Sequence, residues 1–195
     1  TTVQKQHFVE WFSGSALDSI WTFNGTNDAG MKDAVDGGYY LEPPSAANVI
    51  MYMNDKRQYA FDGSVYIGVV GGNLVGSRVD VIHGLAGESE FSGATADKAV
   101  YKHDSSVGFK MNTSDGSTET ATSTTSGNSF VNDSWNVAKI ETKASSVVFS
   151  LDGVADGTIT TTLPDGKMQP ASEVRSIASD GTDYGKIRYV EAYNT

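Results

Sequence analysis

The sequence predicts an all-β protein folded as a two-sheet antiparallel β-sandwich. Its 195 residues include 21 glycines and 9 tyrosines, and small polar residues separate short segments rich in β-branched and aromatic side chains. In several segments the apolar side chains recur at every second residue, the period of a strand with one face in a core. These positions are Val65, Ile67 and Val69; Val79 and Val81; Val107, Phe109 and Met111; and Val147, Phe149 and Leu151.

Turn signals and composition predict the other elements in chain order. Ser13–Ile20 carries at most one helical turn. More than half of residues 112–129 are Ser or Thr, which favours a pair of polar outer strands around a turn. A further strand is expected at 147–151, and a final strand at 186–193. Glycine turns separate the strands at 62–63, 71–73, 115–116, 152–153, 156–157, 165–166 and 180–181.

Plain alternation in the final strand predicts two different faces. Ile187, Tyr189, Glu191 and Tyr193 would share one face, which is mostly aromatic. The other face would carry Arg188, Val190 and Ala192.

Charge and composition exclude several classes of function. The formal net charge of −10 argues against a nucleic-acid-binding surface. The chain has no cysteine, which excludes disulfides, thiol nucleophiles and cysteine-ligated metals. No stretch approaches the length of apolar residues that a membrane span needs, so no membrane partner is expected. The length favours a single domain over residues 1–195.

Two segments at the ends of the chain carry a recognisable pattern. Residues 8–21 read Phe-Val-Glu-Trp-Phe-Ser-Gly-Ser-Ala-Leu-Asp-Ser-Ile-Trp, and residues 147–153 read Val-Val-Phe-Ser-Leu-Asp-Gly after a strand that begins at Trp135. Together with the closing segment 186–193, these resemble concanavalin A-like lectin/glucanase domains, which include laminin G-like modules and glycosyl hydrolase family 16 enzymes. The resemblance implies a jelly-roll sandwich. Trp11, Trp21, Trp135 and Phe149 are expected in its core.

The catalytic motif of the family 16 enzymes is missing from the sequence. Those enzymes use carboxylates at alternate positions of one strand as nucleophile and acid/base. The nearest approach here is the pair Glu88 and Glu90, which lacks the third acid. There is no nucleophile elbow, and the three histidines have no metal-ligand spacing. The sequence therefore predicts that the chain is not an enzyme.

No cofactor is expected, with calcium as the one metal considered. Asp, Asn and turn carbonyls supply the oxygen ligands that calcium prefers, and many relatives bind it. The resemblance implies an aspartate as one ligand in the last strand, where this chain has Arg188. We expect Arg188 to take the place of the cation by pairing with Glu10.

Carbohydrate binding is the activity of lectin-like members of this superfamily. Aromatic platforms and loop Asn or Asp side chains carry it in those proteins. The corresponding hypothesis here is a sugar platform formed by Tyr52, Asn54, Asp55 and Tyr59.

The function expected from the sequence is an extracellular or virion-surface structural or adhesion domain, such as a decoration or fibre-associated jelly roll. Its partners would be copies of itself or a larger protein shell, joined through edge strands. A carbohydrate-binding module that recognises surface glycans is the alternative. A β-glucan hydrolase is the third hypothesis.

Overall fold

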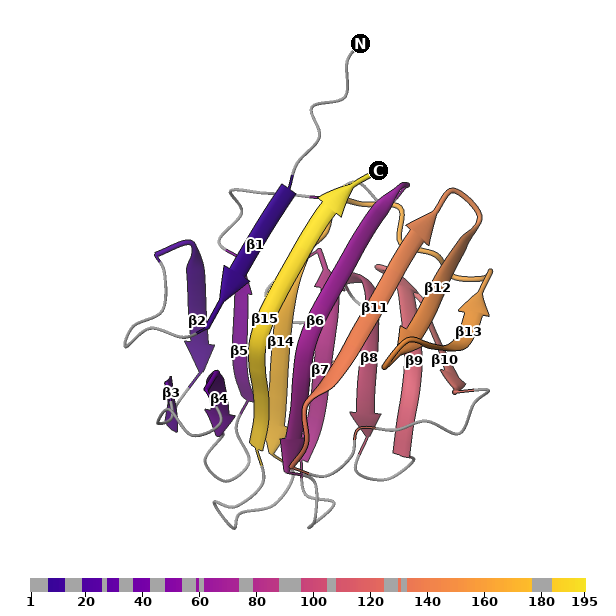
Figure 1. Ribbon diagram of the computed structural model, residues 1–195. Helices are drawn as coiled ribbons and strands as arrows, with labels where there is room; N and C mark the ends of the chain where they lie inside the picture. The colour runs from indigo at the N-terminus through magenta and orange to yellow at the C-terminus, as the bar shows by residue number, and fades with distance from the viewer. Residues whose placement is uncertain are drawn as a thin grey trace.

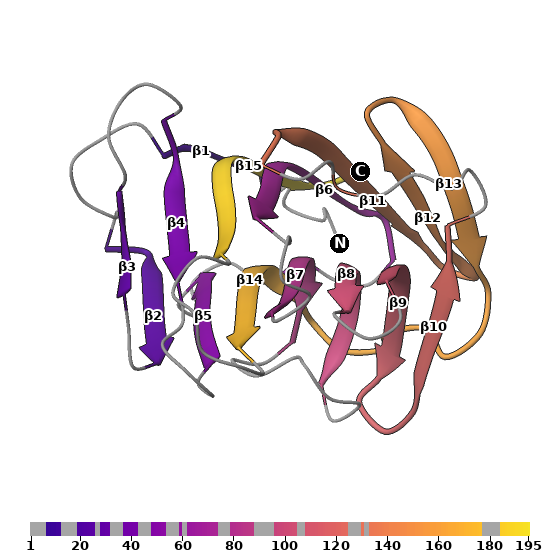
Figure 2. The same cartoon turned by 90° about the horizontal axis from the view of Figure 1, so that it is seen from below.

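The computed structural model describes residues 7–12, 19–25, 28–31, 37–42, 48–53, 59, 62–73, 79–87, 96–104, 108–124, 130, 133–176 and 184–195. All regular elements in these ranges are β-strands, and they form two antiparallel sheets packed face to face. Figure 1 looks onto the outward face of one sheet, and Figure 2 shows the two layers from below. None of the described residues belongs to a helix able to cross a membrane. The all-β sandwich predicted from the sequence is confirmed.

The front sheet in Figure 1 is built around the last strand of the chain. β15 (Tyr184–Asn194) pairs with β6 (Ser64–Asn73) on one side. On its other side, β1 (His7–Trp11) pairs with its upper part and β4 (Tyr39–Glu42) with its lower part. The sheet continues to β3 (Asp28–Met31) beyond β4, and to β11 (Asn136–Lys143), β12 (Ser146–Leu151) and β13 (Val154–Ile159) beyond β6.

The back sheet has seven strands in the order β10, β9, β8, β7, β14, β5 and β2. Their bounds are β2 (Trp21–Gly25), β5 (Asn48–Met53), β7 (Val79–Ala86), β8 (Asp97–Asp104), β9 (Gly108–Asp115), β10 (Glu119–Ser123) and β14 (Gln169–Ser176). β9 and β10 form the polar hairpin expected within residues 112–129, with its turn at Asp115 to Thr118.

The core between the sheets is rich in aromatic rings. Tyr101 stacks on Phe109 at 5.1 Å, and Phe149 meets Tyr101 edge-on at 5.3 Å. Trp21 and Phe149 are buried as expected, whereas the expectation that Trp135 fills the core is wrong, because its ring is partly exposed and packs on the Lys186 ammonium group. The expectation that Trp11 fills the core is wrong, because 61% of its surface is exposed. Trp11 lies between Glu10 and Phe12 in sequence, and alternation along β1 gives Phe8 and Phe12 to the core instead.

A β-bulge in β15 corrects the predicted faces of this strand. Ile187 lies opposite Val70 and Tyr189 opposite Val69, so Arg188 is an extra residue. Ile187 therefore faces the core, while Tyr189 and the alternate residues after it face outward. Val190 and Ala192 are buried, whereas Arg188 is exposed. Plain alternation, which grouped Ile187 with Tyr189 and Arg188 with Val190, was wrong.

Candidate functional site

The outward face of β1 and β15 exposes a cluster of aromatic side chains, which we call the aromatic strip. It consists of His7 and Trp11 from β1 with Tyr189, Glu191 and Tyr193 from β15. The register places Trp11 beside Tyr189 and His7 beside Tyr193, since paired residues of antiparallel strands point to the same face. The Trp11 and Tyr189 rings lie 4.5 Å apart at a tilt of 53°. A tryptophan that is mostly exposed beside a tyrosine offers a platform for an apolar ligand face.

Glu191 fixes the hydrogen-bonding groups of the aromatic strip. The Tyr189 hydroxyl donates to Glu191 Oε2 at 2.8 Å. The His7 ring Nε2 donates to Glu191 Oε1 at 2.9 Å. His7 also packs edge-on against Tyr193, with ring centroids 5.7 Å apart. The carboxylate is thus held between two ring systems at the centre of the strip.

The Tyr189 hydroxyl remains protonated at neutral pH. Burial, and then the hydrogen bond to Glu191 with its negative charge, raise the pKa of Tyr189 to about 12. Its proton is directed at Glu191, so its oxygen lone pairs are left to accept a hydrogen bond from a ligand hydroxyl. The strip therefore combines ring faces with polar groups of fixed orientation.

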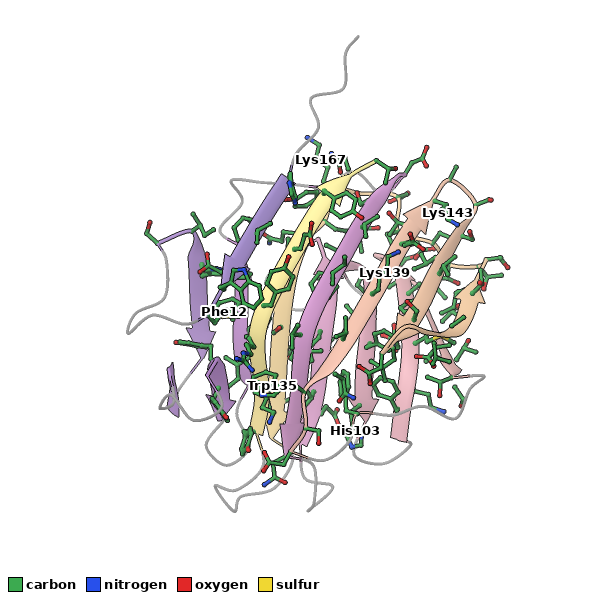
Figure 3. The ribbon with its side chains drawn as sticks, viewed as in Figure 1. Phe12, His103, Trp135, Lys139, Lys143 and Lys167 are labelled. Carbon is green, nitrogen blue, oxygen red and sulfur yellow. The ribbon has the colours of Figure 1, made fainter. Side chains whose placement is uncertain are left out.

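A second aromatic cluster lies at the lower end of β15, where Figure 3 labels Trp135 in front of the sheet. The Lys186 ammonium group lies 4.5 Å from the Trp135 ring centroid and donates to the Asp133 carbonyl at 2.8 Å. Tyr184 donates to the Asp133 carboxylate at 2.5 Å, a bond that lowers the pKa of Asp133. The guanidinium carbon of Arg188 lies 6.0 Å from the same indole ring. This cluster is linked to the aromatic strip because Arg188 directly precedes Tyr189.

The outward face of the back sheet carries buried charges of a different kind. Lys98 from β8 pairs with Glu119 of β10, and Asn112 of β9 donates to the same carboxylate at 2.8 Å. Burial raises the pKa of Glu119, but the bonds from Lys98 and Asn112 outweigh it, so the net pKa is lowered. Lys98 and Asn112 are buried, and Glu173 of β14 is fully buried on this face. Lys98, Asn112 and Glu173 are covered and Glu119 is partly exposed, whereas Trp11 of the aromatic strip is mostly exposed.

The prediction that Tyr59 belongs to an exposed sugar platform is wrong. Tyr59 is fully buried, and its backbone pairs with Met168, so it offers no ring face to a ligand. Tyr52 lies in β5, opposite Ala171 and Thr22. Asn54 and Asp55 lie outside the described residues, as do Glu88 and Glu90.

The structure does not bring Glu10 and Arg188 onto one face. Glu10 lies opposite Val190, whose side chain is in the core, while Arg188 is exposed near Trp135. Among residues that the structure describes, no three acidic or histidine side chains form a group able to hold a metal. Calcium binding stays a prediction.

The sequence contained a signal for the aromatic strip. The alternation of Tyr189, Glu191 and Tyr193 was visible, and it marked one mostly aromatic face. Two pieces of information were missing: which face is outward, and that Trp11 lies beside Tyr189. The bulge decides the first and the pairing of β1 with β15 the second.

Comparisons with known proteins identify the fold. No protein-family model matches the chain, and no curated protein sequence is similar to it. The carbohydrate recognition domain of Emp47p superposes with a TM-score of 0.66 at 9% identity, over 96% of this chain and 94% of that one. The β-glucanase of Bacillus licheniformis also gives 0.66, at 13% identity and over 100% of both chains. A β-1,3-1,4-glucanase (lichenase) from a mouse hindgut metagenome gives 0.63 at 14% identity, over 96% and 98%. The chain has the concanavalin A-like jelly-roll fold.

These similarities correct the prediction that the chain is not an enzyme. The similar structures include two glucanases and a further glycosidic hydrolase as well as carbohydrate recognition domains. That prediction rested on the absence of a sequence motif. The fold itself is shared by proteins that bind glycans and proteins that hydrolyse them, at identities of 9 to 14%.

Proposed function

We propose that this domain recognises glycans through the aromatic strip on β1 and β15. The observation that carries the proposal is the exposed Trp11 ring against Tyr189, with Glu191 holding the Tyr189 hydroxyl in place. The C–H face of a sugar ring packs on aromatic faces, and its hydroxyls exchange hydrogen bonds with neighbouring polar groups. The strip supplies both kinds of group within one pair of strands.

The fold comparisons support a glycan ligand. One similar structure is the carbohydrate recognition domain of Emp47p, and another is the β-glucanase of Bacillus licheniformis. The names of both refer to carbohydrate. A β-1,3-1,4-linked glucan is the ligand class named by one similar structure, and it is the first probe to use.

The test is binding of β-1,3-1,4-glucan by affinity electrophoresis and calorimetry, with Trp11→Ala as the variant. Val154→Ala is the matched control, because Val154 is 51% exposed on β13, away from β15. Loss of one stacking platform is expected to weaken binding by about tenfold or more, and the control is expected to bind as the wild type does. Release of reducing ends is measured in the same samples, so that turnover and binding are recorded separately. Equal binding by Trp11→Ala and wild type would overturn the proposal.

Self-association is a second candidate function for the same sheet face. Val9 and Val137 are each 43% exposed on the outward face of the front sheet. Val9 lies on the same face as the 61% exposed Trp11, and a contiguous exposed apolar patch is typical of a surface that contacts another protein. A structural or adhesion role would make the protein a defined oligomer in light scattering, and Val137→Glu would dissociate it. A monomer at every concentration would exclude this candidate.

A further inference from the structure

We infer that the ligand of the aromatic strip is an extended polysaccharide chain, which lies along β15 and reaches a second subsite formed by Trp135 and Arg188. This inference rests on the proposed function and adds to it the shape and length of the ligand. It depends on the second aromatic cluster of β15, which the Trp11 platform does not include.

Aromatic side chains follow the outward face of β15 along its whole length. Tyr184 lies near the lower end, Tyr189 in the middle and Tyr193 near the upper end. At the strand rise of about 3.3 Å per residue, Tyr184 and Tyr193 are separated by about 30 Å. A single sugar ring covers only one ring pair of this series, whereas an extended chain contacts several at once.

Trp135 lies against the sheet where the second aromatic cluster meets the aromatic strip. Gly38 has φ +100°, and a Cβ atom built there would lie 2.7 Å from the Trp135 ring and 2.8 Å from the Ile187 carbonyl. The indole therefore lies close to the backbone at the start of β4 and at the bulge of β15. Only a glycine permits this close approach. The ring is partly exposed, so it offers surface next to Arg188.

Arg188 supplies the hydrogen-bond donors of the second subsite. It is exposed, and the bulge turns it to the same face as Tyr189, the next residue. A guanidinium carries five N–H donors in one plane, which suits the hydroxyl oxygens of a sugar. Its neighbour Lys186 is fully buried and held by Asp133, so Lys186 supports the indole from below while Arg188 remains accessible.

The two subsites are continuous along the strand. The Phe12 backbone N–H donates to the Arg188 carbonyl at 3.0 Å, directly after the pairing of Trp11 with Tyr189. A chain that stacks on Trp11 and continues downward over Tyr189 thus reaches Arg188 and Trp135 next. The geometry fits a linear polymer whose successive rings contact successive aromatic side chains.

Calorimetry with a trisaccharide and a hexasaccharide of β-1,3-1,4-glucan tests the inference. We expect the hexasaccharide to bind about tenfold or more tightly than the trisaccharide, since it engages both subsites. Arg188→Ala is expected to remove most of this difference, because it lowers the affinity for the hexasaccharide more than the affinity for the trisaccharide. Lys143→Ala is the matched control, because Lys143 is also an exposed cation on the front sheet, at the end of β11.

The outcomes separate this inference from the proposed function. Equal affinities for the two lengths would overturn the extended ligand and leave glycan recognition standing. An equal loss of both affinities in Arg188→Ala, with an unchanged near-ultraviolet circular dichroism spectrum, would overturn the second subsite. A failure of both lengths to bind wild type would overturn the inference and the proposed function together.

Discussion

Acidification is expected to destabilise the fold through a single buried histidine, His83. The side chain is fully buried on β7, where its Nδ1 lies 2.8 Å from Ser172 Oγ and its Nε2 lies 3.4 Å from the Gly71 carbonyl. A neutral imidazole satisfies both contacts, since Nε2–H donates to the carbonyl and Nδ1 accepts from the hydroxyl. Burial lowers the pKa of His83 to about 4, and the contact with Gly71 only partly opposes this.

The sign of the pH dependence follows from this lowered value. The unfolded chain takes up the proton near the usual histidine pKa of about 6.5, whereas the folded chain resists it until about pH 4. Stability is therefore complete above the unfolded value and falls as the pH drops through this window. At about 1.36 kcal/mol per pH unit, the loss between pH 7 and pH 4 amounts to about 3 kcal/mol.

Urea unfolding at a series of pH values measures this loss, with His83→Gln as the variant. The glutamine amide can still donate to Gly71, but it does not titrate. Glu119 and Asp133 have lowered pKa values and also lose stabilisation in acid, a contribution that both proteins share. The wild-type curve should fall more steeply than the variant curve by about 3 kcal/mol between pH 7 and pH 4. Parallel curves of unfolding free energy against pH would refute the reasoning, as would an NMR resonance of the His83 imidazole that titrates near pH 6.5.

Three further substitutions test the core and the glycine contact. Tyr101→Phe removes the hydroxyl that donates to the buried Asp156 carboxylate at 2.7 Å, and it should lower the free energy of unfolding in urea by about 2 kcal/mol. A decrease below about 0.5 kcal/mol would contradict this role. Phe149→Ala leaves a cavity among aromatic rings and should cost about 3 to 5 kcal/mol in the same assay, so a change within about 1 kcal/mol would show that the site collapses around the cavity. Gly38→Ala should lower the free energy of unfolding by more than about 1 kcal/mol and shift the tryptophan fluorescence, because the new methyl group would overlap the Trp135 ring. An unchanged emission spectrum would show that the indole does not lie against residue 38.

The sequence was sufficient to predict the sandwich because its strands repeat with period two and end at glycine turns. The Ser- and Thr-rich region shows how this worked: Thr is β-branched, and residues 119–123 pair with β9 as one of the two polar strands expected there. Phe149 was also placed correctly in the core, because it lies at an alternating apolar position.

The candidate site was less predictable because it depends on contacts distant in sequence. Trp11 and Tyr189 meet only through the pairing of the first strand with the last, and residue spacing does not contain that register. Tyr59 resembled an exposed ring in a polar segment, yet its pairing with Met168 buries it. Local pattern predicts which residues alternate, but long-range pairing decides which of them meet and which are covered.

The bulge at Arg188 has a consequence for how this surface changes between related chains. Removing that one residue would restore regular alternation, with Ile187 still facing the core and Tyr189 still facing outward, so the aromatic strip would keep its place. An aligned sequence that lacks the extra residue would therefore keep the aromatic strip and lose the guanidinium next to Trp135. A related chain with one residue fewer at this position would thus present the strip without the second subsite, whereas an added residue that no bulge absorbs would reverse the two faces of the strand after it.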